Sequence, residues 1–130
     1  MKVLALDYGR ARTGVAVSDP TGTIARPVGV VERARSEDGL ARLAELILEH
    51  DVERVVVGLP LTLRGSRGEQ ARETEDFVQT LAAVTEVPVT TFDERFTTDL
   101  AEQTPADAAE DARAAAHLLS SYLAWASAEA

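Results

Sequence analysis

The order of strand-like and helix-like segments restricts this chain to a small group of folds. Three runs rich in β-branched and apolar residues come first, and helix-like and strand-like segments alternate after them. Three consecutive strands favour an antiparallel meander, whereas the later alternation favours parallel crossovers. We therefore expect an α/β fold in which a mixed five-stranded sheet is flanked by helices. The strand-like runs are Lys2–Leu6, Thr13–Ser18, Ile24–Val31, Glu53–Val57 and Val87–Phe92.

Capping residues and hydrophobic periodicity place the helices between these strands. Ser36 is followed by Glu37 and Asp38, which is the pattern of an N-cap with acids in the first turn. The apolar residues on one face of this helix are Leu40, Leu43, Ala44 and Ile47. A second helix is expected from about Glu69. Its expected inward-facing residues are Phe77, Leu81 and Val84.

The last part of the chain is also expected to be helical. A short helix is predicted over Thr98–Gln103, and Thr104, Pro105 and Asp107 supply an N-cap, a first-turn proline and an acidic first turn for the final helix. Pro27 lies inside the third strand-like run. Because proline cannot donate a backbone hydrogen bond, it indicates an edge strand or a bulge there.

Carboxylates stand at the ends of two predicted strands and on the inner face of the final helix. Asp7 closes the first strand, and Asp93 and Glu94 close the last one. If both strands are central and parallel, their ends meet at the same edge of the sheet. Asp111 belongs to the helix stripe that must face the sheet. The other members of that stripe are Ala115, Leu118 and Tyr122.

Three carboxylates on one dry edge would repel each other and lose hydration unless a cation lay between them. Hard divalent ions such as Mg²⁺ and Mn²⁺ prefer oxygen ligands of this kind. Two such ions about 4 Å apart can activate a water molecule and stabilise the leaving oxygen of a phosphodiester. The sequence therefore favours a site for Mg²⁺ or Mn²⁺, with two ions.

Each acid alone also has an ordinary structural explanation. Asp7 can be a turn former, Asp93 or Glu94 a cap or a salt-bridge partner, and Asp111 an acid near a helix N-terminus, where the helix dipole stabilises it. Only the three together, each at its predicted position, favour chemistry over structure.

Arginines accompany the acids. Guanidinium groups near the acidic edge could hold phosphates bidentately, although single surface arginines are usually only solvated. The arginines concerned are Arg10 and Arg12 after Asp7, Arg64 and Arg67 in the loop after the fourth strand, and Arg95 after the acidic pair. In that loop, Gly65 and Gly68 would let backbone amides approach a phosphate.

Composition sets outer limits. The net charge of −9 is uneven: residues 1–72 carry 11 Lys and Arg against 10 Asp and Glu, and residues 73–130 carry 2 against 12. The molecule as a whole repels a polyanion, unless a basic patch or bound divalent cations reverse this locally.

The absence of cysteine excludes thiolate metal sites and permits a reducing cytoplasm. No segment approaches the about 20 apolar residues of a membrane span. We expect one cytoplasmic domain over residues 1–130.

Four ordered segments resemble the YqgF/RuvX family. They read ALDYGRARTGVAVSD, VVVGLPLTLRGSRGEQA, TTFDERFTT and, from Asp111, D-x3-AA-x-LL-x2-YL. Members of that family are called Holliday junction resolvases or nucleases that mature the 5′ end of pre-16S ribosomal RNA. The resemblance implies an RNase H-like fold and metal-dependent phosphodiester hydrolysis.

The resemblance also implies roles for individual residues. The catalytic and metal-binding acids would be Asp7, Glu94 and Asp111, with Asp93 as an accessory residue. Thr13 and Gly14 would shape the hairpin beside the site. The nucleic-acid contacts would be Arg10, Arg12, Thr13, Arg64, Arg67 and Arg95.

Several functions remain open at this point. The first is a hydrolase, a nuclease that processes structured RNA at the 5′ end of pre-16S rRNA in ribosome biogenesis. An alternative is a resolvase of branched DNA, which would need a homodimer to place two sites symmetrically. The D-x-G start also resembles the phosphate loop of the actin and sugar-kinase group, although an ATP-binding module of that kind needs two lobes. A catalytically silent adaptor with acidic helices is the last alternative.

Overall fold

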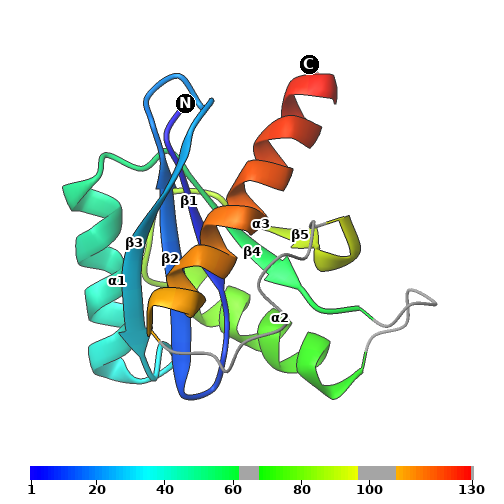
Figure 1. The fold of residues 1–130 in the computed structure, drawn as a ribbon. Coiled ribbons are helices and arrows are strands. Elements are labelled where there is room, and N and C mark those ends of the chain that lie inside the picture. Colours follow the sequence, from blue (N-terminus) through cyan, green and yellow to red (C-terminus); the bar gives the residue numbers. More distant parts are fainter. Residues whose placement is uncertain (62–67, 97–107, 130) are drawn as a thin grey trace.

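All five predicted strands form one mixed sheet with the order β3-β2-β1-β4-β5. The computed structural model describes residues 1–61, 68–96 and 108–129. β1 pairs antiparallel with β2 and parallel with β4, so the first strand of the chain is the central strand of the sheet (Figure 1). The strands are β1 Val3–Asp7, β2 Arg12–Ser18, β3 Ala25–Glu32, β4 Arg54–Leu59 and β5 Val89–Asp93, each within two residues of its predicted bounds.

The helices cover the two faces of the sheet. α1 (Glu37–Glu49) and α2 (Glu69–Ala82) lie on one face, and α3 (Ala108–Glu129) crosses the other (Figure 1). Side chains alternate along each strand, so β1 sends Leu4 and Leu6 to the first face and Val3 and Ala5 to the second. Two hydrophobic cores result, one on each side of the same strands.

Two local predictions about the first half of the chain are confirmed. Ser36 caps α1: its Oγ accepts a hydrogen bond from the Gly39 N–H at 3.0 Å. β3 is an edge strand of the sheet, and its register with β2 shifts between Val15 and Ala16, opposite the Pro27 region. The edge strand and the bulge that Pro27 predicts are therefore both present, and either can accommodate a residue without a backbone N–H.

One predicted core residue is wrong. Phe77 and Leu81 of α2 are fully buried, but Val84 is 49% exposed. α2 ends at Ala82 with Ala83 as its C-cap, so Val84 lies beyond the last turn and does not continue the buried stripe. The inner face also uses Ala71 and Thr74, which the hydrophobic pattern did not select.

Some predictions lie outside the described residues. They are the short helix expected over residues 98–103, the cap residues 104–107 and the loop arginines 64 and 67.

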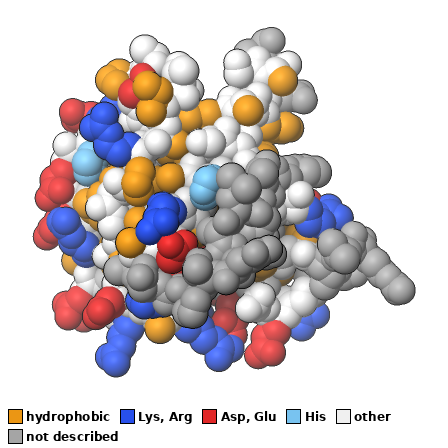
Figure 2. All heavy atoms as spheres, in the orientation of Figure 1, with side chains coloured by type: hydrophobic (Ala, Val, Ile, Leu, Met, Phe, Trp, Pro, Cys, Tyr) orange, Lys and Arg blue, Asp and Glu red, His pale blue; other side chains and the backbone are white. Residues whose placement is uncertain are grey.

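The face that carries α3 mixes charged and apolar side chains. Hydrophobic side chains are most frequent toward the end where both termini lie, and charged side chains of both signs lie there, along one side and at the opposite end (Figure 2). The large exposed apolar residues include Met1, Ile24, Val28 and Trp125. Among the described residues, none of the helices combines the length and the apolar composition that a membrane span requires.

The Ser36 cap gives a stability prediction. Replacing Ser36 with Ala leaves the Gly39 N–H without its acceptor, so we expect the free energy of unfolding to fall by about 1 kcal/mol. Urea denaturation measures this change. Ser127→Ala, at an exposed position of α3, is the matched control and should be neutral. Equal effects of the two substitutions would contradict the capping role.

A candidate active site at the end of the central strand

The candidate site is built around the last residue of β1. Asp7 pairs in register with Gly14 of β2, and on the other side Leu6 pairs with Val57 of β4, which places Gly58 next along that strand. The strands on both sides of β1 therefore carry glycine at the level of Asp7. Residues without side chains at these positions leave room for other elements to approach the Asp7 carboxylate.

Gly14 admits α3. A Cβ atom at Gly14 would lie 2.5 Å from the carbonyl carbon of Asp111 and 3.2 Å from the Ala112 nitrogen. The backbone of α3 at Asp111 therefore lies directly against β2, beside the strand that ends in Asp7. Any side chain at position 14 would force this helix away from the sheet.

Gly58 admits Glu94 in the same way. Glu94 opens a short 3-10 helix (Glu94–Phe96) directly after β5, and β5 pairs parallel with β4. A Cβ atom at Gly58 would lie 2.5 Å from Glu94 Oε1 and 2.9 Å from Glu94 Cγ. The Glu94 side chain therefore crosses the surface of β4 toward the end of β1.

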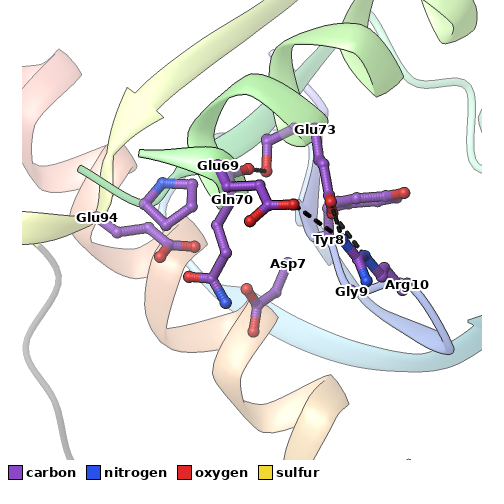
Figure 3. Close-up of a pocket in the computed structure, with 10 residues that line it drawn as sticks. Asp7, Tyr8, Gly9, Arg10, Glu69, Gln70, Glu73 and Glu94 are labelled. Carbon is purple, nitrogen blue, oxygen red and sulfur yellow. Dashed lines mark hydrogen bonds and ion pairs between the residues drawn. The ribbon is translucent and has the colours of Figure 1, made fainter. Parts of the chain in front are cut away.

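Asp7 and Glu94 share a pocket of about 610 Å³. Figure 3 shows the side chains of Asp7, Gln70 and Glu94 pointing toward one another in this pocket. The β1–β2 loop, the end of β4 and the first two turns of α2 form the rest of its wall. The lining residues are Asp7, Tyr8, Gly9, Arg10, Pro60, Glu69, Gln70, Glu73, Thr74 and Glu94.

Burial makes Asp7 a weaker acid than usual. Loss of hydration raises the pKa of the Asp7 carboxyl above its ordinary value, and the nearby negative charge of Asp111 raises it further. A hydrogen bond between Asp7 and Glu94 acts in the opposite direction but does not cancel the effect of burial. Asp7 is therefore in direct contact with Glu94 and within electrostatic range of Asp111, and these are the three acids that the sequence predicted.

Asp111 is held differently from the other two acids. Arg12 Nε lies 2.9 Å from Asp111 Oδ2 in an ion pair, and yet this buried oxygen accepts no hydrogen bond, so the contact has the distance but not the direction of one. Asp111 does not line the pocket that Asp7 and Glu94 share. In the described part of the chain, no three acidic or histidine side chains stand close enough together to hold one metal ion.

The donor set nevertheless fits a hard divalent cation. Two carboxylates in contact at a desolvated strand end, with a third buried carboxylate oxygen that accepts no hydrogen bond nearby, present the ligand type that Mg²⁺ and Mn²⁺ prefer. Asp7 and Glu94 are already together. Asp111 would join them only if its side chain exchanged Arg12 for the cation.

Asp93 and Arg95 bind each other instead of reaching into the pocket. Arg95 Nε donates to Asp93 Oδ2 at 2.9 Å, and the Arg95 backbone N–H donates to Asp93 Oδ1 at 2.9 Å. These hydrogen bonds from Arg95 are the main reason why the pKa of Asp93 is below its usual value. This arrangement favours the structural explanation of Asp93, as a cap of the turn that presents Glu94.

The other predicted nucleic-acid contacts differ in position. Arg10 lines the pocket at its rim, and Arg12 contacts Asp111. Thr13 is fully buried, and its Oγ1 lies 3.4 Å from both the N and O atoms of Gly9. Its position suits the shaping of the β1–β2 loop and not contact with a substrate. Arg64 and Arg67 fall outside the described residues.

Sequence reasoning missed the contribution of α2 to the pocket. Glu69, Gln70 and Glu73 from its first two turns line the wall opposite Asp7. The signal was the pair Glu69 and Glu73, because acids four positions apart lie on one face of a helix. It was not distinguishable from an ordinary solvated helix face without knowing where α2 lies.

The raised pKa of Asp7 gives a prediction about pH. Between the unfolded-state pKa of about 4 and the higher folded-state pKa, the folded protein binds more protons than the unfolded chain, so the free energy of unfolding falls as pH rises. Asp7→Asn removes this loss. In EDTA we expect the variant to be more stable than the wild type at pH 7.5, with the difference disappearing below about pH 4.

Urea unfolding at both pH values measures the effect. Asp76→Asn, which changes an exposed acid of α2, is the control and should not reproduce it. A variant at position 7 that is less stable than the wild type at pH 7.5 would contradict the electrostatic account of this residue.

Known proteins share both the sequence and the fold of this chain. The profile of the RuvX family, described as "Holliday junction resolvase", matches residues 1–125. A Chloroflexus aggregans protein named "Putative pre-16S rRNA nuclease" is 48% identical over 101 residues, covering 78% of this chain and 71% of its own. A Syntrophomonas wolfei protein of the same name is 36% identical over 132 residues, covering 95% and 94%.

Among solved structures, Thermus thermophilus RuvC in complex with a Holliday junction substrate superposes with a TM-score of 0.61. Its identity is 19%, and the match covers 98% of this chain and 96% of that one. This likeness confirms the RNase H-like fold expected from the sequence. Because the family profile covers almost the whole chain, the chain belongs to the RuvX family.

Proposed function

We propose that this protein is a metal-dependent nuclease that hydrolyses phosphodiester bonds in structured RNA, in 5′-end processing of pre-16S rRNA. The observation that carries the proposal is that the side chains of Asp7 and Glu94 point toward each other in one pocket at the end of the central strand (Figure 3). The choice of RNA is supported by the names of the two relatives, both of which refer to pre-16S rRNA. The relative from Syntrophomonas wolfei aligns over nearly the full length of both chains, so the comparison applies to the whole chain.

In this proposal Asp7 and Glu94 hold the Mg²⁺ or Mn²⁺ ions, two in number, and Asp111 completes the set. When bound, such ions supply Lewis acidity that polarises a phosphoryl oxygen and lowers the pKa of a water molecule. The raised pKa of Asp7 fits this role, since a cation would stabilise the ionised carboxylate that burial disfavours.

Arg10 in the β1–β2 loop and Arg12 at the start of β2 supply positive charge beside the acids. Arg10 stands at the rim, where a phosphate next to the scissile one would lie. Arg12 neutralises Asp111 at 2.9 Å and becomes available to a phosphate when Asp111 turns to a cation. Arg12 thus balances an acid in this structure and would balance a phosphate in the complex.

A second candidate is the cleavage of four-way DNA junctions. The description of the family profile favours it, and the fold is that of a junction resolvase. The same three acids would serve both substrates. The two candidates differ in substrate and in oligomeric state. A resolvase must be a dimer, because cutting two strands symmetrically needs two copies of the site.

Asp7→Asn should abolish cleavage while leaving the protein folded. We expect the rate on a structured RNA with a 5′ extension to fall by at least about 100-fold, because a neutral amide holds a divalent cation poorly. The test is a panel of end-labelled structured RNA, single strands and a four-way DNA junction, each with Mg²⁺, Mn²⁺ or EDTA.

The matched control in this panel is Asp76→Asn, which removes one charge from an exposed position of α2. It should cleave like the wild type, and EDTA should stop cleavage altogether. Preference for the junction over RNA would favour the second candidate. Wild-type protein that cleaves nothing with either metal would refute the nuclease, and equal cleavage by Asp7→Asn would refute the site.

Gly58→Ala should damage the site without touching an acid. The added methyl group would meet the Glu94 carboxylate, so Glu94 must move from its position beside Asp7. We expect cleavage to fall by about 10- to 100-fold, as small displacements of catalytic groups cost this much. Steady-state cleavage assays measure the change, and thermal unfolding verifies the fold. In a Glu94→Gln background, Gly58→Ala should add little, and an additive loss would contradict this explanation.

A further inference from the structure

We propose that Glu73 of α2 is a positioning residue that orients Arg10 toward a substrate phosphate at the rim of the pocket. The inference rests on the proposed function, because it assumes a nucleic-acid substrate at Asp7 and Glu94. It adds a role for α2, a helix that carries none of the three predicted catalytic acids.

The Arg10 guanidinium forms a fork of two hydrogen bonds on the Glu73 carboxylate. Arg10 Nε donates to Glu73 Oε2 at 2.8 Å, and the second guanidinium nitrogen of Arg10 donates to Oε1 (Figure 3). Glu69, one turn earlier on the same helix face, lies 3.7 Å from that nitrogen. Residues 63 positions apart are joined, so the β1–β2 loop is tied to α2 across the pocket.

The exposure of the partners shows which one is fixed. The Glu73 side chain is only 24% exposed, whereas the Arg10 side chain is 73% exposed. A long arginine on a loop would otherwise sample many rotamers, and ordering it at the moment of binding costs free energy. The half-buried carboxylate on a rigid helix restricts Arg10 before the substrate arrives.

Arg10 keeps hydrogen-bonding capacity after this pairing. A guanidinium has five N–H donors, and the fork on Glu73 uses two of them. Arg10 also lines the pocket that contains Asp7 and Glu94. The remaining donors are therefore available to a phosphate oxygen at the same rim, in the charge-assisted geometry typical of arginine.

Because the pocket is acidic, the direction in which Kd changes when the Glu73 charge is removed tests this role. Glu69, Glu73, Asp7 and Glu94 all line it, so the pocket is acidic and Arg10 is its basic residue among those described. Removing a negative charge from such a wall should by itself tighten the binding of a polyanion. If Glu73 positions Arg10, removing its charge should weaken binding instead.

The experiment measures binding and not cleavage. Every variant carries Asp7→Asn so that the oligonucleotides stay intact, and fluorescence anisotropy reports Kd for a labelled structured RNA and a labelled four-way DNA junction. We expect Glu73→Gln to weaken binding of the preferred probe by about 3- to 10-fold. The slope of log Kd against the logarithm of the salt concentration should also become shallower, by about the amount that one phosphate contact contributes. A merely structural loss would not change that slope.

The matched control is Asp76→Asn, which removes the same charge from an exposed position of the same helix and should leave Kd unchanged or slightly tighter. Arg10→Ala should weaken binding, and adding Glu73→Gln to it should cause no further loss. Tighter binding by Glu73→Gln would mean that Glu73 competes with substrate for Arg10, and it would overturn the proposal. An equal loss from Glu73→Gln with and without Arg10 would overturn it as well.

These results are independent of the cleavage assays. If the variants bind the probes in this pattern but the wild-type protein cleaves none of them, the proposed nuclease is refuted and the positioning role remains supported. A wild-type protein that cleaves, with Glu73→Gln binding like the control, refutes the positioning role alone.

Discussion

The burial of negative charge at the end of the central strand governs the rest of this structure. A carboxylate taken out of water is costly unless a proton, a cation or a hydrogen-bond donor accompanies it. Here Asp7 interacts with Glu94 and with the negative charge of Asp111. Burial raises the pKa of Asp7, and an ion pair with Arg12 balances Asp111. The cost is understandable if the site exists to receive cations.

An acidic protein that acts on a polyanion needs its positive charge in the right place more than in quantity. The net charge of −9 disfavours nucleic acid at long range, and α2 adds two acids to the pocket wall. Arg10 and Arg12 both lie in or next to the β1–β2 loop, beside the acids that they balance. Divalent cations at the acids would make the pocket less negative and release Arg12 from Asp111, so metal and substrate should bind cooperatively in such a site.

Signals carried by neighbouring residues predicted this protein well, and contacts between distant residues did not. The sheet, the Ser36 cap and the irregularity at Pro27 each depend on a few consecutive residues and were predicted correctly. The sequence also indicated that Asp7 and Glu94 end strands and that Asp111 lies on the inner stripe of α3. It could not show that Arg12 holds Asp111, that Asp93 binds Arg95, or that α2 forms a pocket wall. Those outcomes depend on side-chain directions and on where α2 sits.

The position of Asp111 depends in turn on the small residues of α3. Ala112 and Ala115 are buried against the sheet, and at position 14 the sheet itself offers glycine, so the helix backbone can touch the strand. Further along α3, Leu118 and Tyr122 are buried, and the Tyr122 ring packs edge-on against Phe92 of β5 with centroids 5.6 Å apart. Phe92 lies two residues before Glu94. The same apolar contact therefore fixes the helix that carries one acid and the strand that delivers another. The geometry of the carboxylates is thus a property of the core on the α3 face, and substitutions there would change the site without altering any charged residue.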